Sequence, residues 1–78
     1  MPHVIVKLWP GKSEEEKKQM ADKIVSALEE SIGVKEFAVS VSVEEIEKEN
    51  WDKEVYGPDI AGKESTLVKR PGYGSLKG

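Results

Sequence analysis

The sequence predicts an α+β fold: a βαβ unit with parallel strands, then short C-terminal helices, with two copies together forming a four-stranded sheet. Three stretches indicate this fold. An alternating apolar pattern covers residues 3–9, a pattern with three- and four-residue steps runs from Glu14 to Gly33, and a valine-rich alternation covers residues 37–43. A helix that joins two strands of one sheet makes a right-handed crossover between parallel strands. At 78 residues the chain is expected to form a single domain, residues 1–78.

The first strand and the long helix have well-marked boundaries. Apolar residues at positions 4, 6 and 8 give residues 3–9 the two-residue period of a strand, and Pro10-Gly11 ends it. Ser13 and Glu16 form a capping box, so the helix is expected to begin at about Glu14. Gly33 ends it, because glycine readily adopts the left-handed conformation that follows a last helical turn. The apolar stripe of this helix consists of Met20, Ala21, Ile24, Ala27, Leu28 and Ile32.

The second strand, Phe37 to Val43, places its valines on one face and Ala38, Ser40 and Ser42 on the other. Two strands alone leave both sheet edges with unpaired N–H and C=O groups. A chain of this length also buries a modest core. The sequence therefore predicts a homo-oligomer, with a homodimer favoured.

The region after residue 46 is expected to hold two short helices. Asn50 is the predicted N-cap of the first, which carries Trp51 and Val55 on one side and ends at Gly57. Pro58 suits the first position of the second helix, which is expected to end before Pro71-Gly72. Its apolar residues are Ile60, Leu67 and Val68, and the tail from Tyr73 onward is flexible by composition.

Composition excludes several classes of function. The formal net charge is −3 and the pI is about 5.2, which argues against nucleic acid as a partner. The chain has no cysteine and only His3 among histidines, so we expect no metal site and no disulfide. No apolar run is long enough to span a membrane and the start lacks the features of a secretory signal, so a cytoplasmic location without membrane association is expected.

Pro2 is the candidate catalytic residue. If Met1 is removed, the Pro2 nitrogen becomes a secondary amine that can accept and return a proton, whereas in an internal proline it is an amide. An α-amine has a pKa of roughly 7.7–8.0, and burial or nearby cations lower it toward neutral pH. The alternative is that Pro2 merely begins a strand, where a missing N–H breaks no hydrogen bond.

Residues 2 to about 56 resemble the tautomerase superfamily, in particular small tautomerases similar to 4-oxalocrotonate tautomerase. The resemblance rests on Pro2, the Gly11-Lys12-Ser13-Glu14-Glu15 start of the long helix, the valine-rich second strand and Trp51. In that family the trimmed amino-terminal proline is the proton shuttle. The resemblance implies an isomerase in which Pro2 interconverts the enol and keto forms of a small 2-oxo acid without a cofactor.

The resemblance also suggests substrate-binding residues. Lys12 stands where the family often has an arginine that binds the substrate carboxylate, and Trp51 stands where an aromatic residue lines the pocket. Ser40 replaces a second arginine of the hexameric members, so Arg70, the only arginine, is an alternative cation. The longer C-terminal region, with its Lys69–Tyr73 segment, resembles the dimeric branch of the family.

The replacement at Ser40 keeps a second class of function open. A chain that lacks the usual cation beside the substrate carbonyl can retain the fold and lose efficient catalysis. The alternative is therefore a non-catalytic oligomeric scaffold or ligand-binding protein with a tautomerase fold.

Overall fold

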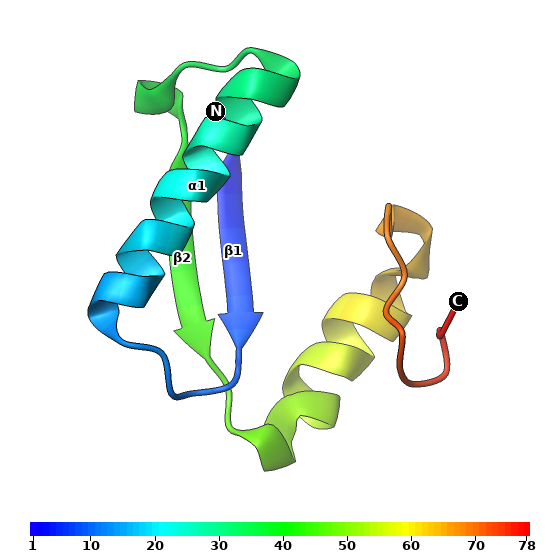
Figure 1. Cartoon of the computed structure of the whole chain (residues 1–78). Helices are drawn as coiled ribbons and strands as arrows, with labels where there is room; N and C mark the ends of the chain where they lie inside the picture. Colours follow the sequence, from blue (N-terminus) through cyan, green and yellow to red (C-terminus); the bar gives the residue numbers. More distant parts are fainter. The chain divides into compact units, whose positions relative to one another are not determined.

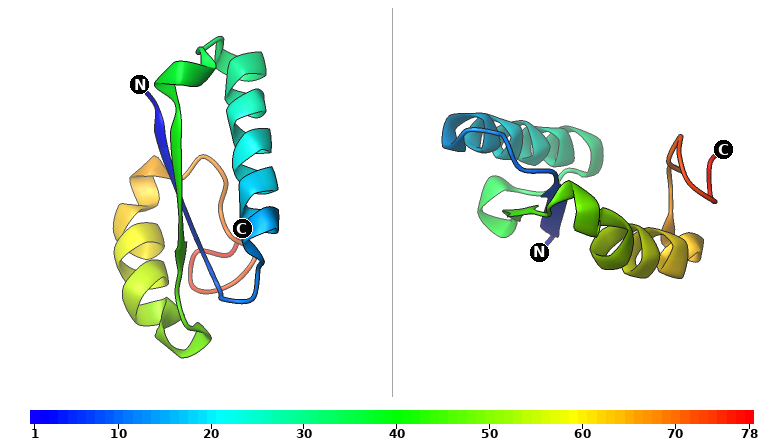
Figure 2. Two further views of the ribbon diagram at one scale, coloured as in Figure 1. Left: turned by 90° about the vertical axis from the view of Figure 1, so that its left-hand side faces the viewer. Right: turned by 90° about the horizontal axis from the view of Figure 1, so that it is seen from below.

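The computed structural model describes residues 1–78. The chain forms two compact units, Met1–Glu45 and Ile46–Gly78, and each is described by itself. The N-terminal unit contains β1 (His3–Leu8), α1 (Glu14–Ile32), the 3-10 helix η1 (Glu36–Ala38) and β2 (Ser40–Glu45). The two strands are parallel, and α1 runs along one face of the sheet (Figures 1 and 2). The predicted βαβ unit is confirmed.

The capping box predicted at the start of α1 is present. Ser13 Oγ accepts a hydrogen bond from the Glu16 N–H at 3.0 Å, and Glu16 Oε1 accepts one from the Ser13 N–H at 2.9 Å. The hydrogen bond from the Ser13 backbone, followed by that from its side chain, lowers the pKa of Glu16. At the other end Gly33 has φ of 71° and its N–H donates to the Glu29 carbonyl at 3.1 Å, as its predicted role requires.

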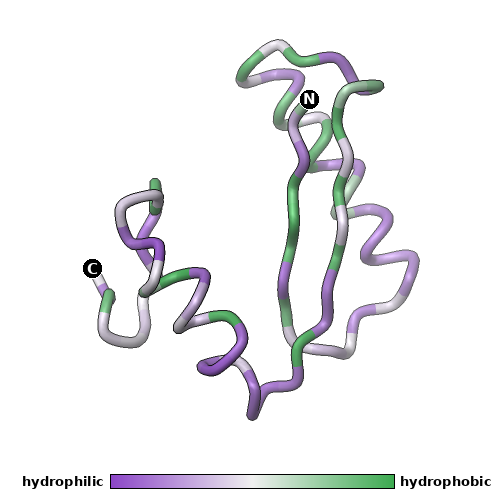
Figure 3. Tube along the Cα trace, turned by 180° about the vertical axis from the view of Figure 1, so that it is seen from behind, coloured by the Kyte–Doolittle hydropathy of each residue, from purple (hydrophilic) through white to green (hydrophobic).

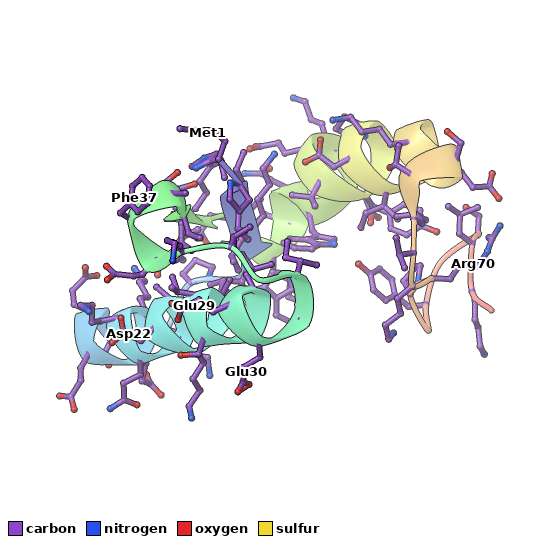
Figure 4. All side chains as sticks on the ribbon, turned by 90° about the horizontal axis from the view of Figure 1, so that it is seen from above. Met1, Asp22, Glu29, Glu30, Phe37 and Arg70 are labelled. Atoms are coloured by element: carbon purple, nitrogen blue, oxygen red, sulfur yellow. The ribbon has the colours of Figure 1, made fainter.

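The sheet has two chemically different faces. Val4 and Val6 pair with Val41 and Val43, whereas the alternate pairs on the opposite face bring His3 to Ser40 and Ile5 to Ser42. The hydrophobic stretches of this unit lie mainly along the strands, and much of α1 is hydrophilic (Figure 3). Glu30 of α1 projects away from the sheet (Figure 4). Ile5, on the serine face, keeps 52% of its surface exposed.

The second strand begins three residues later than predicted. Phe37 lies in η1 and is 85% exposed, and the strand begins at Ser40, whose N–H donates to the Pro2 carbonyl at 3.2 Å. In the observed register His3 is opposite Ser40, so a strand continued back to Phe37 would extend past the start of the chain. The alternating pattern of residues 37–43 therefore misplaced the strand start, because the parallel partner strand β1 begins only at His3, opposite Ser40.

The C-terminal unit is helical, but its boundaries differ from the prediction. It contains the 3-10 helix η2 (Lys48–Asn50), the π-helix η3 (Asp52–Ile60) and the 3-10 helix η4 (Ala61–Thr66). Asn50 is the last residue of η2 and not an N-cap, and η3 continues through Gly57 and Pro58 instead of changing helix there. The predicted boundary between two helices at Gly57 and Pro58 was wrong because these residues were assumed to interrupt an α-helix. The wider turns of η3 include both of them.

Glycines allow the backbone of this unit to approach itself closely. A Cβ on Gly62 would lie 2.8 Å from the Gly57 carbonyl oxygen, so a larger residue at position 62 would collide with the backbone. The expected continuation of a helix to Leu67 and Val68 is also wrong. Leu67 is extended, with φ of −73° and ψ of 119°, and Val68 is fully exposed.

The chain buries few side chains by itself. Val55 of η3, at 4% exposure, is the only buried hydrophobic residue. Large apolar side chains such as Ile5, Trp9 and Phe37 are about half or more exposed. The isolated chain therefore has almost no fully buried core, and most of its apolar side chains are only partly covered. No helix of the structure combines the length and the apolar character needed to cross a membrane.

The last residues of the chain fold back onto η3 through the Tyr56 hydroxyl group. This oxygen accepts a hydrogen bond from the Leu76 N–H at 2.9 Å and lies 3.2 Å from Ser75 Oγ. Gly74 has φ of 75°, and a Cβ at this position would overlap the ring and hydroxyl group of Tyr56. The tail that composition suggested to be flexible therefore has a specific attachment that requires glycine at position 74.

We expect Gly74→Ala to detach this tail. The left-handed backbone alone costs a non-glycine residue about 1–2 kcal/mol, and the overlap with Tyr56 adds to that cost. The measurement is the rate at which trypsin cleaves after Lys69, which should rise in the variant. Gly72→Ala is the matched control, because a Cβ at Gly72 meets nothing within 4 Å. Equal cleavage rates in the two variants would contradict the attachment.

Candidate active site

Pro2 and Ser40 lie together at the amino-terminal ends of the two parallel strands. The Pro2 carbonyl oxygen accepts the Ser40 N–H at 3.2 Å, and His3 is directly opposite Ser40 in the sheet. The side chains of His3 and Ser40 also meet, with 2.6 Å between Nδ1 and Oγ. Met1 precedes this group and is 96% exposed, at the same end of the unit as Phe37 (Figure 4). The sequence indicated Pro2 and Ser40 separately and favoured His3, beside Pro2, as an interface or site-lining residue over a metal ligand.

Lys12 lies at the opposite end of β1 from Pro2. A strand of six residues separates the two positions, which corresponds to roughly 20 Å at about 3.3 Å per residue. A lysine side chain cannot span that distance. Lys12 and Pro2 of one chain therefore do not belong to the same site, and Lys12 can reach a Pro2 only if that proline belongs to another copy.

Lys12 lines a cavity of about 330 Å³ between the end of β1 and the first half of α1. Lys17, which also lines the cavity, forms ion pairs with Glu45 at 3.0 Å and Glu14 at 3.1 Å. The hydrogen bonds that its ammonium group donates to these carboxylates raise the pKa of Lys17, the one to Glu45 most. The cavity is lined by Leu8, Lys12, Glu16, Lys17, Gln19, Met20 and Lys23. Leu8 and Met20 give the cavity an apolar part, and the charged groups beside it are three lysines and the carboxylate of Glu16.

Trp51 belongs to an aromatic cluster of the C-terminal unit. Its indole Nε1–H donates to the Tyr73 hydroxyl group at 3.0 Å, and the Tyr73 and Tyr56 rings pack with centroids 5.5 Å apart. The folded-back tail thus fixes one edge of the indole ring. No spacing in the sequence indicates this contact, because 22 residues separate the two partners.

Arg70 is engaged within the C-terminal unit. Its Nη2 lies 2.6 Å from Glu64 Oε2, and its Nη1 donates to the Leu76 carbonyl at 3.4 Å. A guanidinium with these partners has less capacity for a substrate carboxylate. The structure also contains no cluster of three or more His, Cys, Asp or Glu side chains suited to a metal ion.

Comparison with known proteins identifies the family. Residues 2–56 match the family model described as "Tautomerase enzyme". The chain is 43% identical over 76 residues to a probable tautomerase of Xylella fastidiosa, an alignment that covers 97% of this chain and 93% of that protein. It is also 43% identical over 74 residues to the tautomerase PptA of Pectobacterium atrosepticum, with 94% and 97% covered.

Solved structures give the same result. The crystal structure of YwhB, a homologue of 4-oxalocrotonate tautomerase, superposes with a TM-score of 0.61 at 30% identity and covers 85% of this chain and 98% of that one. TomN, a 4-oxalocrotonate tautomerase homologue in the tomaymycin biosynthetic pathway, superposes with a TM-score of 0.62 at 34% identity, covering 64% and 77%. With a family match that begins at Pro2, relatives that support a tautomerase function and a shared βαβ fold, the chain belongs to the tautomerase family.

Proposed function

We propose that the protein is a keto–enol tautomerase in which Pro2, freed by removal of Met1, is the general acid–base. The observation that carries the proposal is the family match starting at residue 2, together with the position of Pro2 at an exposed strand start and not inside a loop. The proposed substrate is a small enol or 2-oxo acid, and no cofactor or metal is needed for the reaction.

The chemistry requires a neutral amine at the start of β1. The Pro2 nitrogen takes the proton from the enol hydroxyl group, and the protonated amine delivers a proton to carbon at the other end of the conjugated system. Negative charge develops on the substrate oxygen between these steps. Activity should rise with pH through the pKa of the Pro2 amine, because only the unprotonated amine acts as the base.

The remaining site residues have separate roles in the proposal. Lys12 from a second copy binds the substrate carboxylate, and Trp51 forms an apolar wall held by Tyr73. Arg70 is a weaker candidate for the carboxylate because Glu64 already neutralises it. Ser40 lies beside Pro2 and contacts the substrate oxygen.

Turnover of phenylenolpyruvate tests the proposal against the non-catalytic alternative. The trimmed protein should ketonise this enol acid well above the rate in buffer, and its Pro2→Ala variant should lose most of that activity. A rate no higher than that of buffer, in protein with intact fold and no Met1, would favour a scaffold or ligand-binding role.

The active form is proposed to be a homodimer. The two-stranded sheet has two open edges, Val55 is the only buried hydrophobic residue, and Lys12 is too far from Pro2 of its own chain. Pairing of two βαβ units across a two-fold axis would give the predicted four-stranded sheet. Sedimentation should show a dimer at micromolar concentration. A monomer would exclude this assembly, and a hexamer would show that the C-terminal region does not specify the dimeric branch.

A further inference from the structure

We propose that His3 and Ser40 act as a pair that donates a hydrogen bond to the substrate oxygen, in place of the cation that Ser40 replaces. The inference rests on the proposed function, since it adds two residues to the site of Pro2. His3 is the positioning residue and Ser40 is the group that touches the substrate. The sequence favoured His3 only as an interface or site-lining residue and assigned it no part in the reaction.

The sheet register brings the two side chains together. His3 is directly opposite Ser40, both project from the face that carries Ile5 and Ser42, and Nδ1 lies 2.6 Å from Oγ. The Ser40 N–H donates a hydrogen bond to the Pro2 carbonyl, so His3 and Ser40 lie at the same end of the sheet as Pro2. Both side chains are exposed in the isolated chain and are accessible to a ligand.

The direction of this hydrogen bond determines what Ser40 can do. With the proton on Nδ1, the imidazole donates to Ser40 Oγ, and the serine O–H is then available to donate to another oxygen. Hydrogen bonds in such a chain polarise one another, so the serine becomes a better donor than an isolated hydroxyl group. In the reaction Pro2 alone moves the proton from oxygen to carbon. Ser40 and His3 keep their protons and stabilise the charge on the substrate oxygen.

Neither of the two candidate cations is assigned to the substrate oxygen. Lys12 of the same chain lies one strand length away, Lys12 of the second copy is proposed to bind the substrate carboxylate, and Arg70 is paired with Glu64. The polar side chains that the structure holds against the strand end of Pro2 are thus those of His3 and Ser40. A hydrogen bond that strengthens only as negative charge develops on the substrate oxygen lowers the activation barrier of the reaction. It does not tighten binding of the substrate in its ground state.

The test compares variants of the trimmed protein with phenylenolpyruvate as substrate. Ser40→Ala should lower kcat by roughly 100-fold, the lower end of the effect of removing one oxyanion donor, with KM changed much less. His3→Leu should lower kcat in the same way. His3→Asn should restore most of it, because its amide N–H can occupy the place of Nδ1–H. The double variant His3→Leu with Ser40→Ala should be no slower than Ser40→Ala alone.

Ser42→Ala is the matched control, since Ser42 lies on the same strand and face but is opposite Ile5. The inference is wrong if Ser40→Ala and Ser42→Ala have equal kcat, if His3→Asn is as slow as His3→Leu, or if the two losses multiply in the double variant. Pro2→Ala separates the two levels of the proposal. Full activity in that variant removes the proposed function, whereas an inactive Pro2→Ala beside a fully active Ser40→Ala removes only the His3–Ser40 pair.

Discussion

Replacement of Pro2 by alanine is expected to lower kcat/KM for an enol acid by roughly 10²- to 10⁴-fold, the contribution typical of a positioned general acid–base group. The pyrrolidine ring holds the amine in a fixed direction at the start of β1. An alanine amine rotates freely, is better solvated and spends less time aligned with the substrate. The measurement is steady-state turnover of phenylenolpyruvate by trimmed protein in both forms.

The fold must be shown to survive this change. The hydrogen bond that links Pro2 to the sheet is accepted by its backbone carbonyl from the Ser40 N–H, and alanine can accept the same hydrogen bond. Circular dichroism and sedimentation of the variant should therefore match those of the parent. An unchanged kcat/KM in a correctly folded Pro2→Ala protein would contradict the assignment of Pro2 as the base.

Loss of the Lys12 side chain is expected to raise KM for an enol acid by about 10- to 150-fold, which corresponds to the roughly 1.5–3 kcal/mol of a hydrogen bond to a charged group. The kcat should change little, because the carboxylate is bound equally in the ground state and the transition state. An uncharged enol should be affected much less. Lys23→Ala is the matched control, since Lys23 lines the same cavity from α1.

The position of Lys12 also predicts that it acts on a neighbouring chain. Mixing Pro2→Ala and Lys12→Ala subunits should restore the low KM of the parent protein, because a mixed dimer then contains one site with both residues intact. If the two residues acted within one chain, every site of the mixed dimer would lack one of them and KM would stay as high as that of Lys12→Ala. Equal loss with charged and uncharged enols would argue against carboxylate binding.

Local signals in the sequence were sufficient for the first half of the fold. The Ser13–Glu16 capping box and Gly33 act through neighbouring backbone groups, so the bounds of α1 follow from residues within a few positions. The start of β2 does not follow from neighbouring residues. It depends on where its parallel partner β1 begins, which is why Phe37 lies in η1 and Ser40 in the strand.

The site shows the same division. Pro2 is recognisable because its chemistry depends only on its place in the chain, whereas the His3–Ser40 contact depends on strand register across 37 residues. The bond from Trp51 to Tyr73 depends on the folded-back tail and could not be derived from spacing. In the C-terminal unit, Gly57 was interpreted as the end of one helix and Pro58 as the start of the next, because such residues usually interrupt an α-helix, but one π-helix contains both.

The state of the amino terminus tests the central claim most directly. A retained Met1 converts the Pro2 nitrogen into an amide, which cannot hold a proton near neutral pH, and adds an exposed side chain where the substrate must approach. Intact mass and turnover should be measured on the same samples, from preparations with different degrees of trimming. We predict that activity is proportional to the fraction of molecules that lack Met1, whereas full activity in protein whose mass still includes Met1 would contradict the Pro2 mechanism.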